Sequence, residues 1–263
     1  MARWIIQKKF NRLPRLKNPI LVEGLPGMGQ VGKIAVDFLI DALKPKMLYK
    51  IYSHDFWHSV YFNDEGFVEL PSVCLYYCTG KKRDLLFLAG DDQPNTPRAS
   101  YQFSEKILDI AEELGCKELI TLGGIGMPSE VKNPQVFGAV NDEMTRNKYS
   151  KLSIDFQLSK KIEAIVGASG LLLGLARLRG ISGMALLTET YGHPSHLGFK
   201  EAKNVLTHLK KIVGIEVNLA DLEKESVEYE KTQLRMKDTE QEVSRLKKLR
   251  THFGDKSDTK YIG

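Results

Sequence analysis

The fold class is indicated by the stretch Ile20-Leu21-Val22-Glu23-Gly24-Leu25-Pro26-Gly27-Met28-Gly29-Gln30-Val31-Gly32. It begins with a short apolar run that is typical of a buried strand, passes through a glycine-rich turn and enters a segment with helical spacing. We expect the helix to extend from about Gln30 to Leu43, because Pro45 cannot lie inside it. A strand that leads through a tight turn into a helix is the repeating unit of parallel α/β sheets.

The same alternation of strands and helices continues to about residue 215. Strands are predicted at residues 47–52, 66–70, 73–78, 85–89, 118–122, 136–141 and 182–188. Helices are predicted at residues 100–114, 169–179 and 199–213. This order indicates a three-layer α/β fold with a mixed, mainly parallel sheet, in which residues 20–23, 118–122 and 182–188 form buried strands.

The composition changes near residue 217 and predicts three parts. Residues 1–217 form the α/β core with a basic N-terminal segment. Residues 218–250 contain eight acidic and eight basic side chains and no Gly or Pro, which indicates a long charged helix. Its heptad seam is half polar, so we expect self-association through the core rather than through this helix. Residues 251–263 are polar and are expected to form a flexible tail.

Composition and charge exclude several classes of protein. The chain has 263 residues, of which 42% are apolar and 27% charged, so a wholly disordered chain is excluded. No apolar run approaches the ~18 residues of a membrane span, and we expect a cytoplasmic protein that binds no membrane. The net charge is +5, but only the first 18 residues are one-sided, with six basic and no acidic side chains: Arg3, Lys8, Lys9, Arg12, Arg15 and Lys17. We interpret them as a solvated arm or edge strand and predict no nucleic-acid partner.

The three cysteines indicate no disulfide framework and no four-cysteine zinc site. Cys74, Cys78 and Cys116 each lie in a strongly apolar stretch. We expect them to be small core residues of a protein in a reducing compartment.

Gly27, Gly29 and Gly32 match the G-x-G-x-x-G pattern between a strand and a helix, which is the context of a dinucleotide site. The acidic residue that would bind a ribose about 20 positions later is missing, and the nearest acid is Asp55. We therefore predict no NAD(P) cofactor. A tight turn that brings the helix close to the strand explains the glycines without a ligand, and nucleotide binding is the alternative.

Two further glycine-rich segments, Gly123–Gly126 and Gly167–Gly170, are predicted as loops at strand ends. In open α/β sheets such loops gather at the carboxyl edge, where ligands usually bind. Tight connections also need glycine for steric reasons, so the sequence leaves both interpretations open.

The polar residues form no recognisable catalytic or metal-binding set. His54 and His58 lack the spacing of a zinc helix, and His193 and His196 have only Glu189 nearby in the sequence. Ser129–Lys132 matches the S-x-x-K pattern at chance level, and no G-x-S-x-G is present. We predict no catalytic residues, no cofactor and no metal.

Taken in order, four segments resemble the proteasome-assembly-chaperone family in its archaeal branch. The segments are Leu21–Gly32, Ile120–Gly126, Gly167–Leu173 and Leu186–Gly192, within residues 18–215. The resemblance implies a three-layer core similar to that of nucleoside phosphorylases and hydrolases, and a non-catalytic role. It also implies homo-oligomers, for which we expect a tetramer, and C-terminal extensions that reach the α-ring of the 20S proteasome and help to open it without ATP.

The resemblance further implies docking by the C-terminal tail. In the family a terminal carboxylate meets a lysine between α subunits, and the tail motif is a hydrophobic residue, a penultimate tyrosine and any residue. Here Tyr261 is third from the end, so the partner-binding residues carried over are Lys260, Tyr261, Ile262 and Gly263. The departure leaves open whether the tail opens the gate or only docks. The alternative function is a nucleosidase-like hydrolase or ligase that uses the glycine-lined sheet edge.

Overall fold

A computed structural model describes residues 4–229 and 231–232 of the chain. The chain divides into two compact units, residues 1–219 and residues 220–263. In the second unit, residues 220–229 and 231–232 are helical. The rest of the predicted extension 218–250 beyond residue 232, and the predicted tail 251–263, lie outside the described residues.

The first unit is built around an eight-stranded mixed sheet in the order β1-β3-β6-β7-β2-β8-β10-β9. The strands are β1 (Trp4–Lys8), β2 (Ile20–Gly24), β3 (Lys46–Ser53), β6 (Val73–Cys78), β7 (Leu85–Gly90), β8 (Glu118–Met127), β9 (Val136–Val140) and β10 (Ser182–Tyr191). The four central strands, β7, β2, β8 and β10, run parallel to one another, and the remaining pairings at both flanks are antiparallel. The predicted mixed, mainly parallel α/β fold is therefore confirmed.

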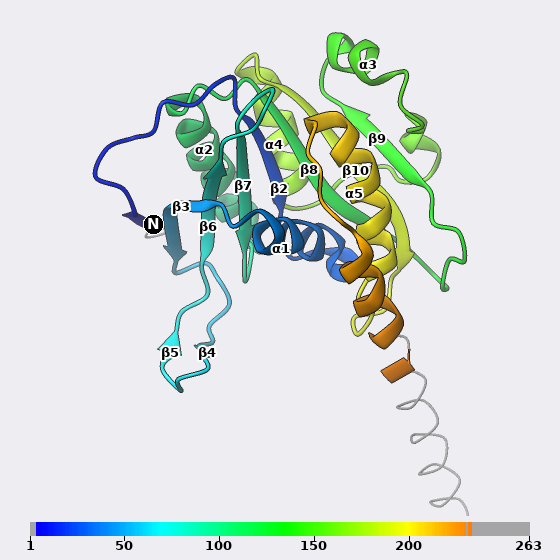
Figure 1. Cartoon of the computed structure of the whole chain (residues 1–263), viewed down its shortest axis with the longest axis horizontal. Helices are drawn as coiled ribbons and strands as arrows, with labels where there is room; N and C mark the ends of the chain where they lie inside the picture. The colour runs from blue at the N-terminus through cyan, green and yellow to red at the C-terminus, as the bar shows by residue number, and fades with distance from the viewer. Residues whose placement is uncertain (1–3, 230, 233–263) are drawn as a thin grey trace, which may run out of the picture. The chain divides into compact units, whose positions relative to one another are not determined.

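Helices cover both faces of the sheet and complete the three layers (Figure 1). Helix α1 (Val31–Leu43) packs with α5 (Phe199–Val213) on one face, and α2 (Pro97–Glu113) packs with α4 (Ala168–Leu178) on the other. Two short 3-10 turns, η1 (Met28–Gln30) and η2 (Leu158–Lys160), and helix α3 (Glu143–Tyr149) complete the elements. Within the described residues, no helix is long and apolar enough to cross a membrane.

The buried strands predicted at residues 20–23, 118–122 and 182–188 are confirmed, but the second continues further than the sequence indicated. Strand β8 runs through Gly123–Gly126 to Met127, so the loop predicted there is wrong. Parallel pairing with β10 extends to Met127 and Tyr191, and this long partner holds the glycines in an extended conformation.

Two other predicted elements differ from the structure. The strand predicted at residues 66–70 is reduced to β5 (Val68–Glu69), which pairs only with β4 (Tyr61–Phe62) in a separate two-stranded sheet. The basic N-terminal segment provides an edge strand, β1, as one of its two interpretations expected. Helix α3 was not predicted, because its seven residues are mostly polar and show no apolar periodicity.

The cysteines follow their prediction in part. Cys74 and Cys116 are buried, whereas Cys78 is only half-buried at the end of β6, and all three are free thiols. Burial raises the pKa of each thiol, which keeps these side chains protonated and unreactive near neutral pH.

Candidate functional site at the carboxyl edge of the sheet

The carboxyl ends of the central strands meet the turn between β2 and α1, and the two are in direct backbone contact. A Cβ placed on Gly32 would lie 2.3 Å from the carbonyl oxygen of Leu122, and one on Gly24 would lie 2.1 Å from the carbonyl oxygen of Gly32. No side chain fits at such distances. These two glycines therefore allow helix α1 to cross the strands at van der Waals contact.

The turn between β2 and α1 also contacts the glycines of β8. A Cβ on Gly124 would lie 2.5 Å from the carbonyl oxygen of Met28 and 2.6 Å from Cγ2 of Thr190. Gly29 has a φ of +60°, and its carbonyl oxygen accepts a hydrogen bond of 2.7 Å from the N–H of Gly198. Thr190 and the backbone of Gly198 thus contact the turn directly at Gly29, which supports the packing interpretation of the glycines.

Glu23 is the buried acid of this edge. It is 1% exposed, and its two carboxylate oxygens accept hydrogen bonds from Ser169 Oγ (2.9 Å) at the start of α4 and from Leu25 N–H (3.1 Å). Burial raises the pKa of Glu23 to about 7, and the two hydrogen bonds only partly oppose that rise. A carboxyl group with such a pKa is a candidate proton donor or acceptor, but here both oxygens are engaged and enclosed.

Gln93 joins the same loops through its side-chain amide. Its Nε2 donates to the carbonyl oxygen of Pro26 at 2.5 Å, and its Oε1 accepts from Ala168 N–H at 3.0 Å, at the first turn of α4. Gln93 therefore satisfies the first free N–H group of α4, and Ser169 links the same turn to Glu23. The arrangement holds the ends of β2, β7 and α4 together.

The sequence places Glu189 near His193 and His196, but the structure pairs His196 with a different acid. His196 Nε2 lies 3.2 Å from Oε1 of Glu201, which also accepts from Thr190 Oγ1 at 3.2 Å. Glu189 instead pairs with Lys161 Nζ at 3.0 Å and accepts from Gln135 N–H at 3.2 Å. Over the residues that the structure describes, no group of three or more His, Cys, Asp or Glu side chains is arranged to hold a metal.

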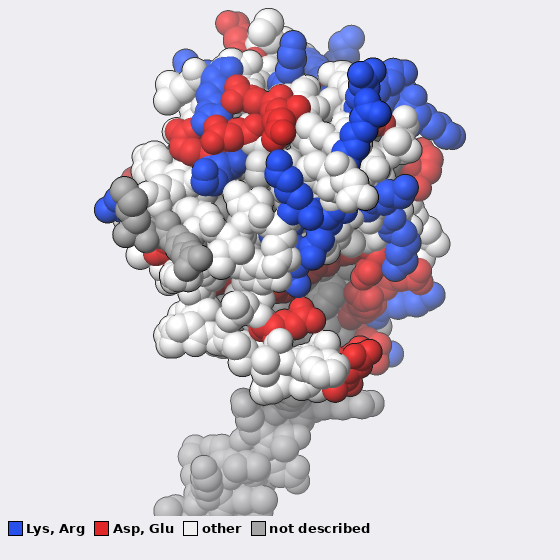
Figure 2. Space-filling model, turned by 90° about the vertical axis from the view of Figure 1, so that its left-hand side faces the viewer, with Lys and Arg blue, Asp and Glu red and all other residues white. Residues whose placement is uncertain are grey.

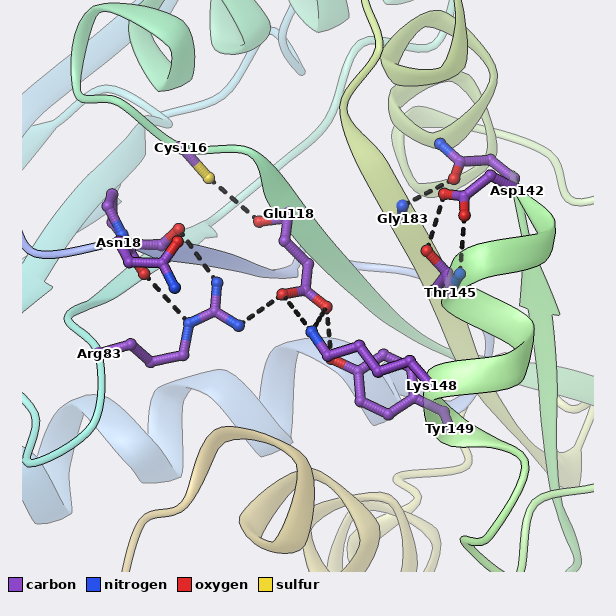
Figure 3. Close-up of polar contacts among 11 residues, drawn as sticks. Asn18, Arg83, Cys116, Glu118, Asp142, Thr145, Lys148, Tyr149 and Gly183 are labelled. Carbon is purple, nitrogen blue, oxygen red and sulfur yellow. Dashed lines mark hydrogen bonds and ion pairs between the residues drawn. The ribbon is translucent and has the colours of Figure 1, made fainter.

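A second buried acid, Glu118, lies at the opposite, amino end of β8 (Figure 3). Its carboxylate accepts from Arg83 Nη1 at 2.5 Å and from Lys148 Nζ at 2.7 and 2.9 Å, and it also accepts from the hydroxyl of Tyr149. Burial acts to raise the pKa of Glu118, but the donors from Lys148, Tyr149 and Arg83 outweigh it, so that the pKa lies below its ordinary value. The sequence offered no signal for this cluster, because its members come from separate elements.

The match to a family model covers residues 21–236 and identifies the PAC2 family. The chain belongs to the PAC2 family. The resemblance to proteasome-assembly chaperones that the four sequence segments indicated is therefore confirmed.

Relatives of this PAC2 protein match it over nearly the whole chain. An uncharacterized protein of Methanocaldococcus jannaschii, MJ1210, is 32% identical over 260 residues, which are 98% of each chain. The structure of Pyrococcus furiosus PbaB, described as an archaeal proteasome activator, is similar with a TM-score of 0.81 and 34% identity. That match covers 90% of this chain and 100% of PbaB.

A second Pyrococcus furiosus structure is also similar. PbaA, described as an archaeal homolog of proteasome-assembly chaperone, has a TM-score of 0.74 and 25% identity, and the match covers 95% of this chain and 99% of PbaA.

The partner-binding residues predicted in this PAC2 protein are not among those just described. Lys260, Tyr261, Ile262 and Gly263 lie outside the described residues. The structure identifies three polar features that the sequence did not indicate: Glu23, Gln93 and the Glu118 cluster. Their hydrogen bonds and ion pairs link separate elements of the core, which indicates a structural role.

Proposed function

We propose that this PAC2 protein is a non-catalytic, proteasome-binding factor that acts as an assembly-chaperone homologue or as an ATP-independent activator. The observation that carries the proposal is the 34% identity to PbaB, an archaeal proteasome activator, over 90% of this chain. The 25% identity to PbaA, an archaeal homolog of proteasome-assembly chaperone, supports the same role.

The carboxyl edge of the sheet supports a binding role rather than catalysis. In α/β enzymes this edge holds the substrate in a crevice. Here the turn at Gly29 contacts Thr190, Gly124 contacts Met28, and Glu23 is enclosed with both oxygens hydrogen-bonded. These contacts occupy residues that a nucleosidase-like enzyme would use for its substrate, and they favour the non-catalytic role.

In the proposed mechanism, the core of residues 1–217 carries the extension 218–250, and the tail 251–263 binds the α-ring of the 20S proteasome. Tyr261 and Ile262 would provide the apolar contacts of a compact ligand. A homo-oligomer, for which we propose four copies, would present several tails at once, so that each tail can bind weakly. A cytoplasmic location is part of the proposal.

The test is retention of purified 20S particles by immobilised protein. We expect the full chain to retain 20S particles, and a chain that ends at residue 250 to lose about tenfold or more of that binding. Tyr261→Ala should reproduce much of the loss, whereas the matched control Tyr261→Phe keeps the ring and should bind nearly as well as the original chain. Equal retention by the full and shortened chains would refute tail docking.

Hydrolysis of a fluorogenic peptide by the same 20S particles separates the two forms of the proposal. Stimulation that depends on Tyr261 identifies an activator. Binding that depends on Tyr261 without stimulation of peptide hydrolysis identifies a docking chaperone. That outcome would agree with the position of Tyr261, which is third from the end instead of penultimate.

A further inference from the structure

The largest concentration of exposed apolar side chains lies in residues 57–70, which we call the hairpin segment. Of 14 large apolar residues that are exposed in the described chain, seven are in this segment. They are Trp57, Val60, Tyr61, Phe62, Phe67, Val68 and Leu70, with exposed fractions between 45% and 73%. Isolated surface apolar residues are ordinary, but a contiguous aromatic group of this kind marks an interface.

The hairpin segment has a defined shape without a core of its own. Its turn is held by Asn63, whose Oδ1 accepts from Glu65 N–H (3.1 Å) and from Phe67 N–H (2.9 Å). Strands β4 and β5 pair over only two residues each, and every residue from 61 to 70 is exposed. A two-stranded hairpin is marginal in water unless another surface covers it. Local hydrogen bonds therefore hold the backbone of the hairpin in shape, while its apolar side chains remain exposed to solvent.

Charge is segregated between this segment and the start of the chain. Residues 51–80 contain four acidic side chains and no Lys or Arg, and three of the four acids, Asp64, Glu65 and Glu69, lie in the hairpin segment. The opposite charge is carried by five exposed residues, which we call the basic segment: Lys8, Lys9, Arg12, Arg15 and Lys17. Within the described part of the chain, no carboxylate forms an ion pair with any of these five side chains, although the backbone N–H of Lys17 donates to Asp84.

The five basic side chains and residues 61–70 are all exposed, so the two segments do not cover each other within one copy. In Figure 1 the hairpin of β4 and β5 extends below the sheet, whereas the loop that follows β1 runs along its upper end. The face in Figure 2 carries Lys and Arg side chains together with a group of Asp and Glu side chains over its upper part, and its lower left part is largely uncharged. The acids of the hairpin segment and the cations of the basic segment are nevertheless complementary in charge.

We propose that the hairpin segment of one copy docks on the basic segment of a second copy, in a head-to-tail contact. The seven apolar side chains can bury roughly 100 Å² each, which approaches the ~800 Å² per partner of a stable interface. Leu13 and Leu16, half-buried between the basic residues, offer an apolar surface for the aromatic rings. Asp64 and Glu65 then face Arg12 and Arg15 of the neighbouring copy.

A head-to-tail contact has a consequence for assembly. The two surfaces that meet are different, so an open assembly keeps one free hairpin segment at one end and one free basic segment at the other until it closes into a ring. This inference gives a physical contact to the homo-oligomer of the proposed function, and it depends on that homo-oligomer but not on the binding of 20S particles.

The first test measures the mass of the full chain in solution by light scattering. We expect the original chain to be oligomeric and Phe62→Ser with Phe67→Ser to fall to the 29.7 kDa of one copy. Leu178→Ser, which removes an apolar residue that is 82% exposed on α4, is the matched control and should leave the mass unchanged. Far-ultraviolet circular dichroism of each variant checks that the fold is retained.

A charge exchange then identifies the surface on the second copy. Arg12→Glu with Arg15→Glu makes both segments acidic, and Asp64→Lys with Glu65→Lys makes both basic, so each variant alone should lose association by about tenfold or more. Mixed in equal amounts, the two variants restore both contacts and should associate again.

Three results would overturn the inference. One is an original chain that is monomeric, and another is a hairpin variant that keeps the oligomer. The third is a charge-exchanged mixture that stays monomeric, because the basic segment would then not be the partner surface. If the hairpin variant instead loses retention of 20S particles while the original chain is a monomer, the hairpin contacts the proteasome and the proposed function survives without this inference.

Discussion

The two ends of the central strands each bury a glutamate, and the protein holds the two in opposite ways. At the carboxyl end, Glu23 receives hydrogen bonds from a hydroxyl and a backbone N–H, and burial raises its pKa to about 7. At the amino end, Glu118 receives hydrogen bonds from Arg83, Lys148 and Tyr149, and its pKa is lowered despite burial. The difference shows that the supply of cationic donors, rather than burial itself, decides the charge of a buried acid.

The comparison also explains where function can lie. At the carboxyl end, backbone packs against backbone at Gly24, Gly32 and Gly124, in the turn where many α/β folds bind a ligand. The amino end is closed by an ion cluster that joins α3 to the sheet. Both ends therefore stabilise the core, and the contacts that we propose with other molecules lie elsewhere, in the hairpin segment and in the tail.

The largest expected effect concerns the backbone contact at the carboxyl end. Gly32→Ala places a methyl group 2.3 Å from the carbonyl oxygen of Leu122, and the strand cannot move away without breaking its pairing. We expect the free energy of unfolding to fall by more than about 3 kcal/mol, or the chain to fail to fold. Urea unfolding followed by circular dichroism measures the change.

The control for this prediction is a glycine without a close neighbour. Gly174 lies inside α4 and has nothing within 4 Å of an added Cβ, so Gly174→Ala should raise stability by about 0.5–1 kcal/mol. If both variants behave alike, the close approach at Gly32 is not what holds the turn.

A smaller effect is expected at the amino end. Arg83→Met removes a cation whose side chain is 12% exposed, and leaves part of the Glu118 charge without compensation. We expect a loss of about 2–3 kcal/mol in the free energy of unfolding at pH 7.

Lys148 provides the matched comparison for Arg83, because it binds the same carboxylate but its side chain is 52% exposed. Lys148→Met should therefore cost below about 1 kcal/mol. Equal losses for the two variants would contradict the role given to burial.

A further effect, smaller than that of Arg83→Met, is a pH dependence with opposite signs at the two ends. The pKa of Glu23 in the folded state lies above its value of 4.5, so the folded state binds a proton that the unfolded chain has released, and stability falls as pH rises from about 4.5 to about 7. The pKa of Glu118 in the folded state lies below its ordinary value. The stability that the ionised Glu118 contributes is therefore complete above the ordinary pKa, and it is lost as pH falls from there through the lowered pKa of the folded state.

Glu23→Gln tests this dependence directly. The variant should lose the decline in stability between pH 4.5 and 7. Its free energy of unfolding relative to that of the original chain should therefore be about 1–2 kcal/mol higher at pH 8 than at pH 5. Chemical unfolding at a series of pH values measures the difference. A variant whose pH profile runs parallel to that of the original chain would show that Glu23 is not the acid responsible.

Much of the core could be predicted from the sequence because its signals are local. The buried runs at 20–23, 118–122 and 182–188 and the helix at 199–213 follow from apolar periodicity, which the chain must satisfy wherever it folds. The extension of β8 through Gly123–Gly126 could not be predicted, because glycine favours a loop locally and only pairing with β10 makes it a strand. The candidate site was visible only as glycines, without an indication of what would fill the space above them.

The sequence by itself determined the α/β class, the order of the main strands and helices, the glycine-rich turn at residues 24–32 and the membership of the family. These properties depend on periodicity and on short motifs, which one segment carries alone. The tertiary structure decided the opposite fates of Glu23 and Glu118 and the closure of the carboxyl edge. It also decided the exposure of the hairpin segment. Each of these depends on which distant atoms lie within a few ångströms, and only the folding of separate elements against one another sets those distances.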